Sequence, residues 1–156
     1  MAEDDPTDDN ETELGGSVGP IVSSAHLAMG GSPALSELEF GLILAQHAFG
    51  RWMVRAMAAA GVSDLPRLDV LVLHTVNHRD RAKKLADICL VLSVEDTHTV
   101  TYAIRKLEKL GLVESGKQGK EKTVRVTEAG EVACLRYKEV RETLLVGPVR
   151  ATGLPE

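Results

Sequence analysis

Residues 93–112, SVEDTHTVTYAIRKLEKLGL, are the stretch from which the fold can be worked out. Apolar side chains recur there at steps of three and four, which predicts a helix with one buried face formed by Val100, Ala103, Ile104, Leu107 and Leu110. The opposite face is polar and carries His98, Thr101, Tyr102, Arg105 and Lys109, with Thr99 and Lys106 at its margin. Ser93, with Asp96 three residues later, predicts the helix start, and Gly111 is placed to close its end.

The segment after this helix has the pattern of a β-hairpin. Residues 113–115 and 123–126 are predicted as strands, because Val124 and Val126 alternate with polar residues. Residues 116–122 form the loop between them and carry Lys117, Lys120 and Lys122, while Arg125 adds a charge on the second strand. A helix with a hydrogen-bonding outer face, followed by a basic hairpin, fits a DNA groove and its flanking phosphates.

Further helices are predicted on both sides of this unit. Residues 83–92 form an amphipathic helix, so that it and the next helix make a helix-turn-helix. Another helix is expected to start at Ser63 or Asp64, with Pro66 in its first turn. After the hairpin, Thr127 is expected to cap a last helix that runs to about residue 146 and ends at Gly147.

The first predicted helix, residues 36–60, has apolar side chains on more faces than one small domain can cover. A second copy of the chain is a natural source of that cover, and the aromatic pair Phe49 and Trp52 suits an interface. The alternative is that the pair packs inside one domain. The residues expected at the dimer interface, from the first and last helices, are Leu38, Leu42, Phe49, Trp52, Met53 and Leu144.

These elements predict a mainly α fold with a small β-hairpin, a winged helix-turn-helix whose first and last helices form a dimerisation region. Residues 35–146 are the expected DNA-binding and dimerisation domain, and residues 147–156 a C-terminal tail. Residues 1–34, acidic and then rich in glycine and serine, are expected to be disordered. This segment is either a plain solubilising tail or an arm that competes with DNA for the basic face.

The distribution of charge agrees with nucleic-acid binding although the total does not. The chain has a formal net charge of −5, but residues 1–34 hold seven acidic side chains and no lysine or arginine. Between Arg79 and Arg125, eleven basic side chains stand against seven acidic ones. The basic excess therefore coincides with the predicted helix-turn-helix and hairpin.

Other functional classes have weaker support in the sequence. Cys89 and Cys134 lie in apolar helical contexts and are expected to be buried thiols, with a redox pair as the alternative. His74 and His78 have the spacing of metal ligands, but no metal or other cofactor is expected. No catalytic arrangement stands out, so an enzyme is not expected. No signal peptide or membrane span is recognisable, which predicts a cytoplasmic protein without a membrane partner.

Five short segments together resemble the MarR family of winged helix-turn-helix transcription regulators. Each is common among winged helices, but their order and spacing over about residues 38–146 are more specific: LDVLVL at 68–73, KLA at 84–86, TVT at 99–101, KLEKLGLV at 106–113 and VRVTEAG at 124–130. The resemblance implies a homodimer on a pseudo-palindromic operator, with each recognition helix in a major groove and each wing on a minor groove. It also implies that a small molecule, often phenolic, releases the DNA.

By position, the resemblance assigns groove contacts to Thr99, Thr101, Tyr102 and Arg105. His98 and Lys109 are added from the helical pattern alone, and the wing contributes Lys117, Lys120, Lys122 and Arg125. One departure concerns the wing, where Gln118 and Lys120 stand in place of the family's Asp-x-Arg. A lysine contacts phosphate but lacks the guanidinium fork, so base readout by the wing is not expected.

The sequence thus predicts a sequence-specific regulator that binds double-stranded DNA, of the repressor type. Two alternatives remain open. One is a winged helix used as a protein-interaction module, for which the outer helix face offers only Tyr102 as an apolar anchor. The other is a cytoplasmic redox or metal sensor that uses Cys89, Cys134 or the histidines.

Overall fold

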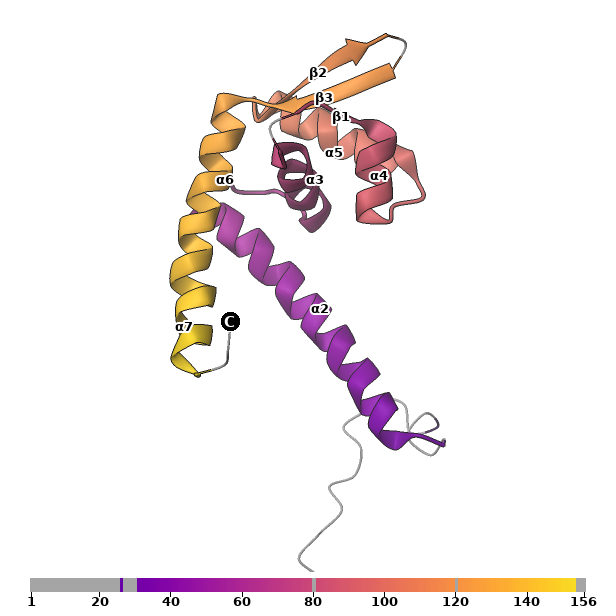
Figure 1. Cartoon of the computed structure of the whole chain (residues 1–156), viewed down its shortest axis with the longest axis vertical. Coiled ribbons are helices and arrows are strands. Elements are labelled where there is room, and N and C mark those ends of the chain that lie inside the picture. Colours follow the sequence, from indigo (N-terminus) through magenta and orange to yellow (C-terminus); the bar gives the residue numbers. More distant parts are fainter. Residues whose placement is uncertain (1–25, 27–30, 80, 120, 154–156) are drawn as a thin grey trace, which may run out of the picture. The chain divides into compact units, whose positions relative to one another are not determined.

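The computed structural model describes residues 26, 31–79, 81–119 and 121–153. The chain divides into two units, residues 1–45 and residues 46–156. Helix α2 (Pro33–Ala59) begins in the first unit and continues into the second, which holds all of the remaining elements (Figure 1). Most of residues 1–34, and the question of disorder there, lie outside the described residues. Helix α2 starts at Pro33, three residues before the predicted start at residue 36.

The second unit has the predicted order of helices and strands. Helices α3 (Arg67–Asn77), α4 (Leu85–Leu92) and α5 (Thr97–Lys109) precede the strands β2 (Val113–Gln118) and β3 (Glu121–Val126). Helix α6 (Glu128–Arg141) follows the hairpin (Figure 1). The α3 helix starts later than expected, because Asp64 has a positive φ of 63° and Pro66 is the cap residue.

A third strand was missed. Lys83 and Lys84 form β1 (Lys83–Lys84), which pairs antiparallel with β3 and gives the sheet order β1-β3-β2. The sequence instead placed Lys83 and Lys84 at the start of α4. Two residues are too few to show the alternating pattern by which a strand is recognised. The Lys83 side chain is buried, and its ammonium donates hydrogen bonds to the carbonyl oxygens of His78 and Arg81.

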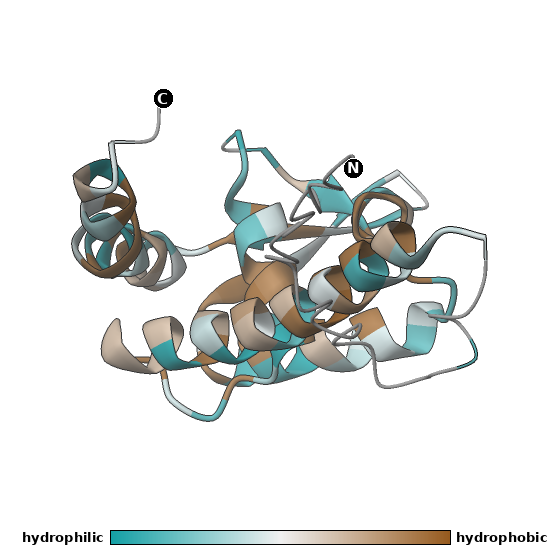
Figure 2. Ribbon diagram, turned by 90° about the horizontal axis from the view of Figure 1, so that it is seen from below, coloured by the Kyte–Doolittle hydropathy of each residue, from teal (hydrophilic) through white to brown (hydrophobic). Residues whose placement is uncertain are grey.

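The core of this unit lies under the sheet and between the helices. Its fully buried side chains come from the end of α2, the segment before α3, helices α3 to α5 and strand β3: Met57, Leu65, Val70, Val72, Leu73, Val76, Ile88, Val100, Ile104, Leu107 and Val124. Hydrophobic and hydrophilic residues share the same helices in Figure 2, as expected for amphipathic elements around one core. All the predicted apolar residues of α5 lie in this core except Leu110, which is 48 % exposed.

The end of the chain differs from the prediction at Gly147. Helix α6 is followed directly by a π-helical turn, η1 (Glu142–Val146), and by helix α7 (Gly147–Ala151). Gly147 has ordinary helical angles, and Pro148 stands at the start of α7, where its missing N–H costs nothing. Residues 147–151 are therefore helical, and the expected tail does not begin there.

The predicted dimer residues fall into two groups. Leu38, Leu42, Phe49 and Leu144 are each at least half exposed, and Trp52 packs partly against the core. Met53 is only 6 % exposed and belongs to the core of its own chain, so its assignment to a dimer interface was wrong. The error arose because a helix apolar on several faces does not show which face its own domain covers.

Candidate nucleic-acid interface

Helix α5 is fixed at its start by Asp96 and not by Ser93. The Asp96 carboxylate accepts a hydrogen bond from the backbone N–H of His98 at 2.9 Å. Ser93 instead has a left-handed conformation (φ 52°) and closes the preceding helix α4. The short segment between the two helices therefore sets where α5 begins, and its first residues point away from the core.

The end of α5 agrees with the prediction. Gly111 has φ +70°, its N–H donates to the Glu108 carbonyl, and the N–H of Leu112 donates to the Leu107 carbonyl. These two bonds form the Schellman motif, in which glycine adopts the left-handed conformation at little cost. The motif ends the helix and directs the chain into β2.

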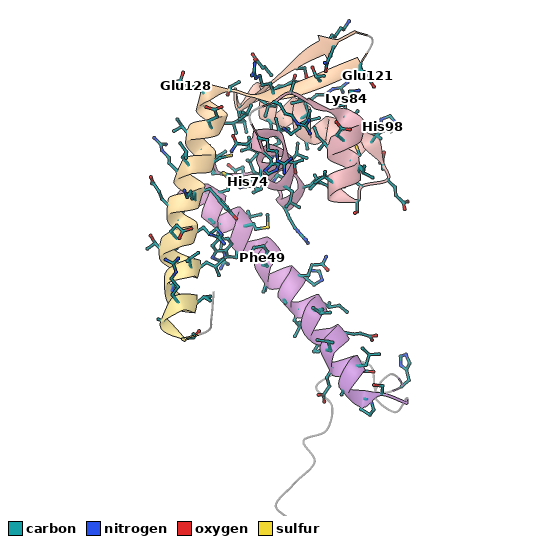
Figure 3. The ribbon with its side chains drawn as sticks, in the orientation of Figure 1. Phe49, His74, Lys84, His98, Glu121 and Glu128 are labelled. Atoms are coloured by element: carbon teal, nitrogen blue, oxygen red, sulfur yellow. The ribbon has the colours of Figure 1, made fainter. Side chains whose placement is uncertain are left out.

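The outer face of α5 is exposed as predicted. His98, Thr99, Tyr102, Arg105 and Lys109 are accessible, and Tyr102 is 75 % exposed; His98 lies on the outer side in Figure 3. Thr101 is half-buried. A surface hollow of about 640 Å³ runs along this face and is lined by Tyr102, Arg105, Lys106, Glu108 and Lys109. The face offers an arginine fork, hydroxyl groups and an aromatic ring to a partner.

The two threonines are restricted in what they can recognise. The Thr99 hydroxyl donates to the Asp96 carbonyl at 2.7 Å, and the Thr101 hydroxyl donates to the Thr97 carbonyl at 2.9 Å. With their protons engaged, both oxygens remain available as acceptors. On a base edge they therefore suit the amino groups of adenine or cytosine.

Lys106 has a structural role that the sequence did not reveal. Its ammonium lies 3.7 Å from the Asp69 carboxylate on α3 and donates a hydrogen bond to the backbone carbonyl of Asp64. Asp69 is buried, and burial raises the pKa of its carboxyl above 3.8 although the Lys106 charge and hydrogen bond act to lower it. The pair fixes the rotation of α5 against α3. The only sequence signal was an aspartate between the apolar residues of LDVLVL.

The wing is a regular two-stranded ribbon and not the long loop expected. Strands β2 and β3 extend to Gln118 and Glu121, which leaves two residues to connect them. Gly119 has φ +64°, as a tight hairpin turn requires. Lys117 and Lys122 are therefore strand residues directly opposite each other, and the prediction that residues 116–122 form a loop was wrong. Lys120 lies outside the described residues.

The outer part of the wing is tied to β1. The Lys84 ammonium on β1 lies 2.5 Å from the Glu121 carboxylate on β3, and the two are seen together in Figure 3. Arg125 is exposed and stands opposite Glu114 in the strand register. The exposed lysine pair at 117 and 122 is thus presented by a ribbon that is held next to its turn, through Glu121.

One residue joins α5, the wing and α6. The Thr127 hydroxyl donates to the Gly111 carbonyl at 2.6 Å and accepts from the N–H of Gly130 at 3.1 Å, which confirms it as the cap of α6. The Thr127 N–H also donates to the Leu112 carbonyl at 3.1 Å. The backbone of Gly130 packs closely against the Leu112 carbonyl, since a Cβ at position 130 would lie 2.1 Å from the Leu112 oxygen. This junction determines the angle between recognition helix and wing.

Both cysteines are buried thiols, as expected from the sequence. Cys89 and Cys134 are both buried and free. Burial, assisted by the nearby Glu131 charge, raises the pKa of the Cys134 thiol to about 11. At neutral pH, about one Cys134 in ten thousand would then be the reactive thiolate.

The two histidines line one surface pocket, but only His74 lies within a helix. His74 lies within α3 and packs its ring against Tyr137 at 4.5 Å, whereas His78 follows the helix in an extended conformation. Among the described residues, no group of three potential ligands is placed to hold a metal ion. None of the described helices is both long enough and apolar enough to cross a membrane.

Comparison with known proteins agrees with this geometry. Residues 65–130 match the family model of the winged helix DNA-binding domain. A search of curated proteins finds no match.

Solved structures with the same arrangement include a MarR-family transcription regulator and two further proteins. A MarR-family regulator from Rhodococcus sp. RHA1 is 16 % identical and has a TM-score of 0.57, covering 76 % of this chain and 91 % of its own. RV1404 from Mycobacterium tuberculosis is 15 % identical, with a TM-score of 0.60 and coverage of 76 % and 80 %. CouR from Rhodococcus jostii RHA1, bound to p-coumaroyl-CoA, is 16 % identical, with a TM-score of 0.56 and coverage of 74 % and 87 %.

At such identities the likeness concerns the fold, and it confirms the resemblance drawn from the sequence motifs. The chain carries a winged helix DNA-binding domain at residues 65–130 and has the fold of the MarR-family transcription regulators.

Proposed function

We propose that this protein is a sequence-specific regulator of transcription that binds double-stranded DNA, as a repressor of the MarR type. The observation that carries the proposal is the exposed polar face of α5 beside a basic wing. Arg105 on that face fits a guanine edge, and Thr99 and Thr101 fit amino groups of bases. The mechanism is binding and not catalysis, and its place is the cytoplasm.

The wing supplies affinity without base recognition. Lys117 and Lys122 are like charges directly opposite each other on one face of the ribbon, which is unfavourable in the free protein. A phosphate between them relieves that repulsion. Such contacts contribute to all DNA sequences and weaken as salt concentration rises.

The partner assembly is a homodimer on a pseudo-palindromic operator, released by a small effector. The apolar residues left exposed on α2 and near the C-terminus, including Leu38, Leu42, Phe49 and Leu144, support the dimer. Support for an effector comes from the similar fold of CouR, whose structure contains p-coumaroyl-CoA. Two recognition helices related by a two-fold axis would contact two half-sites.

Selection of bound sequences from random DNA tests this function, with Arg105→Ala and Lys122→Ala compared in the full chain. Arg105→Ala should relax the preference at one symmetric pair of positions, because arginine contacts to a base discriminate by about 1–3 kcal/mol. Lys122→Ala should weaken binding to all sequences alike and lower the salt slope by about one per site. Lys138→Ala, on the exposed part of α6, is the matched control and should change neither. No enriched sequence with the wild type would refute the proposal.

A second candidate function is protein contact through α4. Leu90 and Val91 are 80 % and 68 % exposed, more than is usual for side chains of this kind, and they lie next to each other. Replacing both with serine should leave DNA selection unchanged if α4 serves a protein partner. A changed DNA preference would instead place α4 at the DNA.

A further inference from the structure

A second site lies on the winged unit, on elements other than α5 and the wing. It is a pocket of about 370 Å³ between the second half of α2 and the start of α3. Its lining consists of His47, Gly50, Arg51, Val54, Arg55 and Arg67. Three of these six residues are arginines, and none is acidic.

The position of Arg67 depends on a glycine within helix α2. Gly50 is buried, and a Cβ at this position would lie 2.9 Å from Cδ, 3.4 Å from Nε and 3.6 Å from Nη1 of Arg67. The Arg67 side chain therefore lies directly across the backbone of α2. Glycine within a helix lowers its stability relative to alanine. Here it leaves room for the Arg67 side chain, which lines the same pocket as Arg51 and Arg55.

The three guanidinium groups have no acidic partner within the described part of the chain. None of the described ion pairs includes Arg51, Arg55 or Arg67. From residue 46 to residue 60 the sequence has no Asp or Glu, and Arg51 and Arg55 repel each other at the i, i+4 spacing. Asp69, in the first turn of α3, is already engaged by Lys106. The pocket therefore concentrates uncompensated positive charge.

The shape and chemistry of the pocket favour one ligand class. Guanidinium groups bind phosphate oxygens through paired N–H donors, and three of them match a doubly charged phosphate better than a singly charged carboxylate. Helix α3 begins at Arg67 without a capping side chain, so the positive end of its dipole lies at the same place. The volume suits a small molecule, and the three exposed arginines that line the pocket are open to solvent.

We propose that this pocket binds the phosphate group of a small phosphorylated molecule. Arg51, Arg55 and Arg67 hold the phosphate oxygens, and Val54 with the backbone at Gly50 forms the apolar wall for the rest of the ligand. This binding is separate from DNA recognition and does not require it.

Calorimetric titration of the full chain at fixed ionic strength tests the proposal, with inorganic phosphate, phenyl phosphate and benzoate as probes. Phenyl phosphate should bind more tightly than benzoate, and Arg67→Ala should weaken it about tenfold or more, the effect of losing one charged hydrogen bond. The control Arg136→Ala removes an exposed arginine of α6 outside the pocket and should not change the affinity. Binding of inorganic phosphate alone, without a gain from the phenyl group, would identify a free-phosphate site.

A second variant keeps every charge and changes only the geometry. In Gly50→Ala the new Cβ displaces Arg67, so affinity for phenyl phosphate should fall while the thermal midpoint does not. The proposal is overturned if wild type fails to bind phenyl phosphate, if benzoate binds as tightly, or if Arg67→Ala or Gly50→Ala binds like the control. It is also overturned if Arg67→Ala weakens nonspecific DNA binding alone, which would assign these arginines to the DNA backbone.

Discussion

At the scale of single residues, His74 and Asp69 place ionisable groups against the core. His74 has one ring nitrogen, Nε2, that is buried without a hydrogen-bond partner in the described structure, and Figure 3 shows the residue within the winged unit. Asp69 is a buried carboxylate whose partner, Lys106, is partly exposed. Both are sites where the charge state and the stability of the fold are coupled.

The first prediction concerns His74 and acid. Burial lowers the pKa of His74 below 6.5, so the unfolded chain takes up a proton at a higher pH than the folded one. The His74 contribution to stability is present above pH 6.5 and is lost as the pH falls from 6.5 through the lower pKa of the folded state. His74→Phe should therefore lose less unfolding free energy than wild type between pH 7 and pH 5, measured by urea denaturation. Equal losses would show that His74 does not titrate differently in the folded state.

The second prediction concerns Lys106. Lys106→Ala leaves the buried Asp69 carboxylate without its positive partner. At pH 7 this should lower the free energy of unfolding by about 1–3 kcal/mol. We expect the lower end of that range, because Lys106 is partly exposed and water screens its charge. Because the pKa of Asp69 is already raised above 3.8, its stabilising form is the protonated one, and its contribution is lost as the pH rises through the folded pKa. The cost of Lys106→Ala should therefore shrink on acidification. Lys109→Ala, on exposed α5 surface, should show neither effect.

At the scale of elements, the junction at Thr127 decides how the recognition helix is presented. The end of α5, the start of β2 and the first turn of α6 meet there through the carbonyls of Gly111 and Leu112. Gly130 permits the contact because its Cα lies against the Leu112 carbonyl and the Val126 side chain. Here the glycine is required for space and not for a positive φ.

The third prediction follows from this contact. In Gly130→Ala the Cβ would lie 2.1 Å from a backbone oxygen, which cannot move as a side-chain tip can. The variant should lose at least the 1–3 kcal/mol typical of overpacking, measured by thermal or denaturant unfolding. Gly147→Ala is the matched control, since its Cβ would make an ordinary contact at 3.4 Å within a helix. That control should be neutral or slightly stabilised.

At the scale of the whole molecule, α2 serves two purposes along its length. Its later residues Met53, Ala56 and Met57 complete the core of the winged unit, while Leu35, Leu38, Leu42 and Ile43 are all more than half exposed. Deletion of the entire helix would therefore damage the core as well as any interface. Point substitutions in residues 35–44 separate the two roles.

The fourth prediction is that the intact protein sediments as a dimer at micromolar concentration. Leu38→Glu combined with Leu42→Glu should give a monomer, because a charge at a buried apolar contact is unfavourable, and should weaken binding to a two-half-site operator. The thermal midpoint of the winged unit should change little, since neither leucine is part of its core. A wild-type monomer would contradict the proposed assembly.

The sequence by itself determined the order of the elements and the core face of α5. Hydrophobic periodicity is a local property, so residues 100–107 revealed which side is buried and which is polar. The same holds for Gly111 and Thr127, because left-handed caps and side-chain caps depend on a few neighbouring residues. The exposed positions of His98, Tyr102 and Arg105 followed from this pattern.

Only the tertiary structure decided the features that join distant parts of the chain. Strand β1 exists because β3 pairs with it, and two residues carry no periodicity of their own. The Lys106–Asp69 pair and the Arg67 side chain across Gly50 are contacts between different helices, which spacing along one helix does not reveal. The same applies to Met53, since an apolar residue on a many-sided apolar helix is equally suited to a core and to an interface. Which of these it joins depends on the packing of its neighbours in three dimensions.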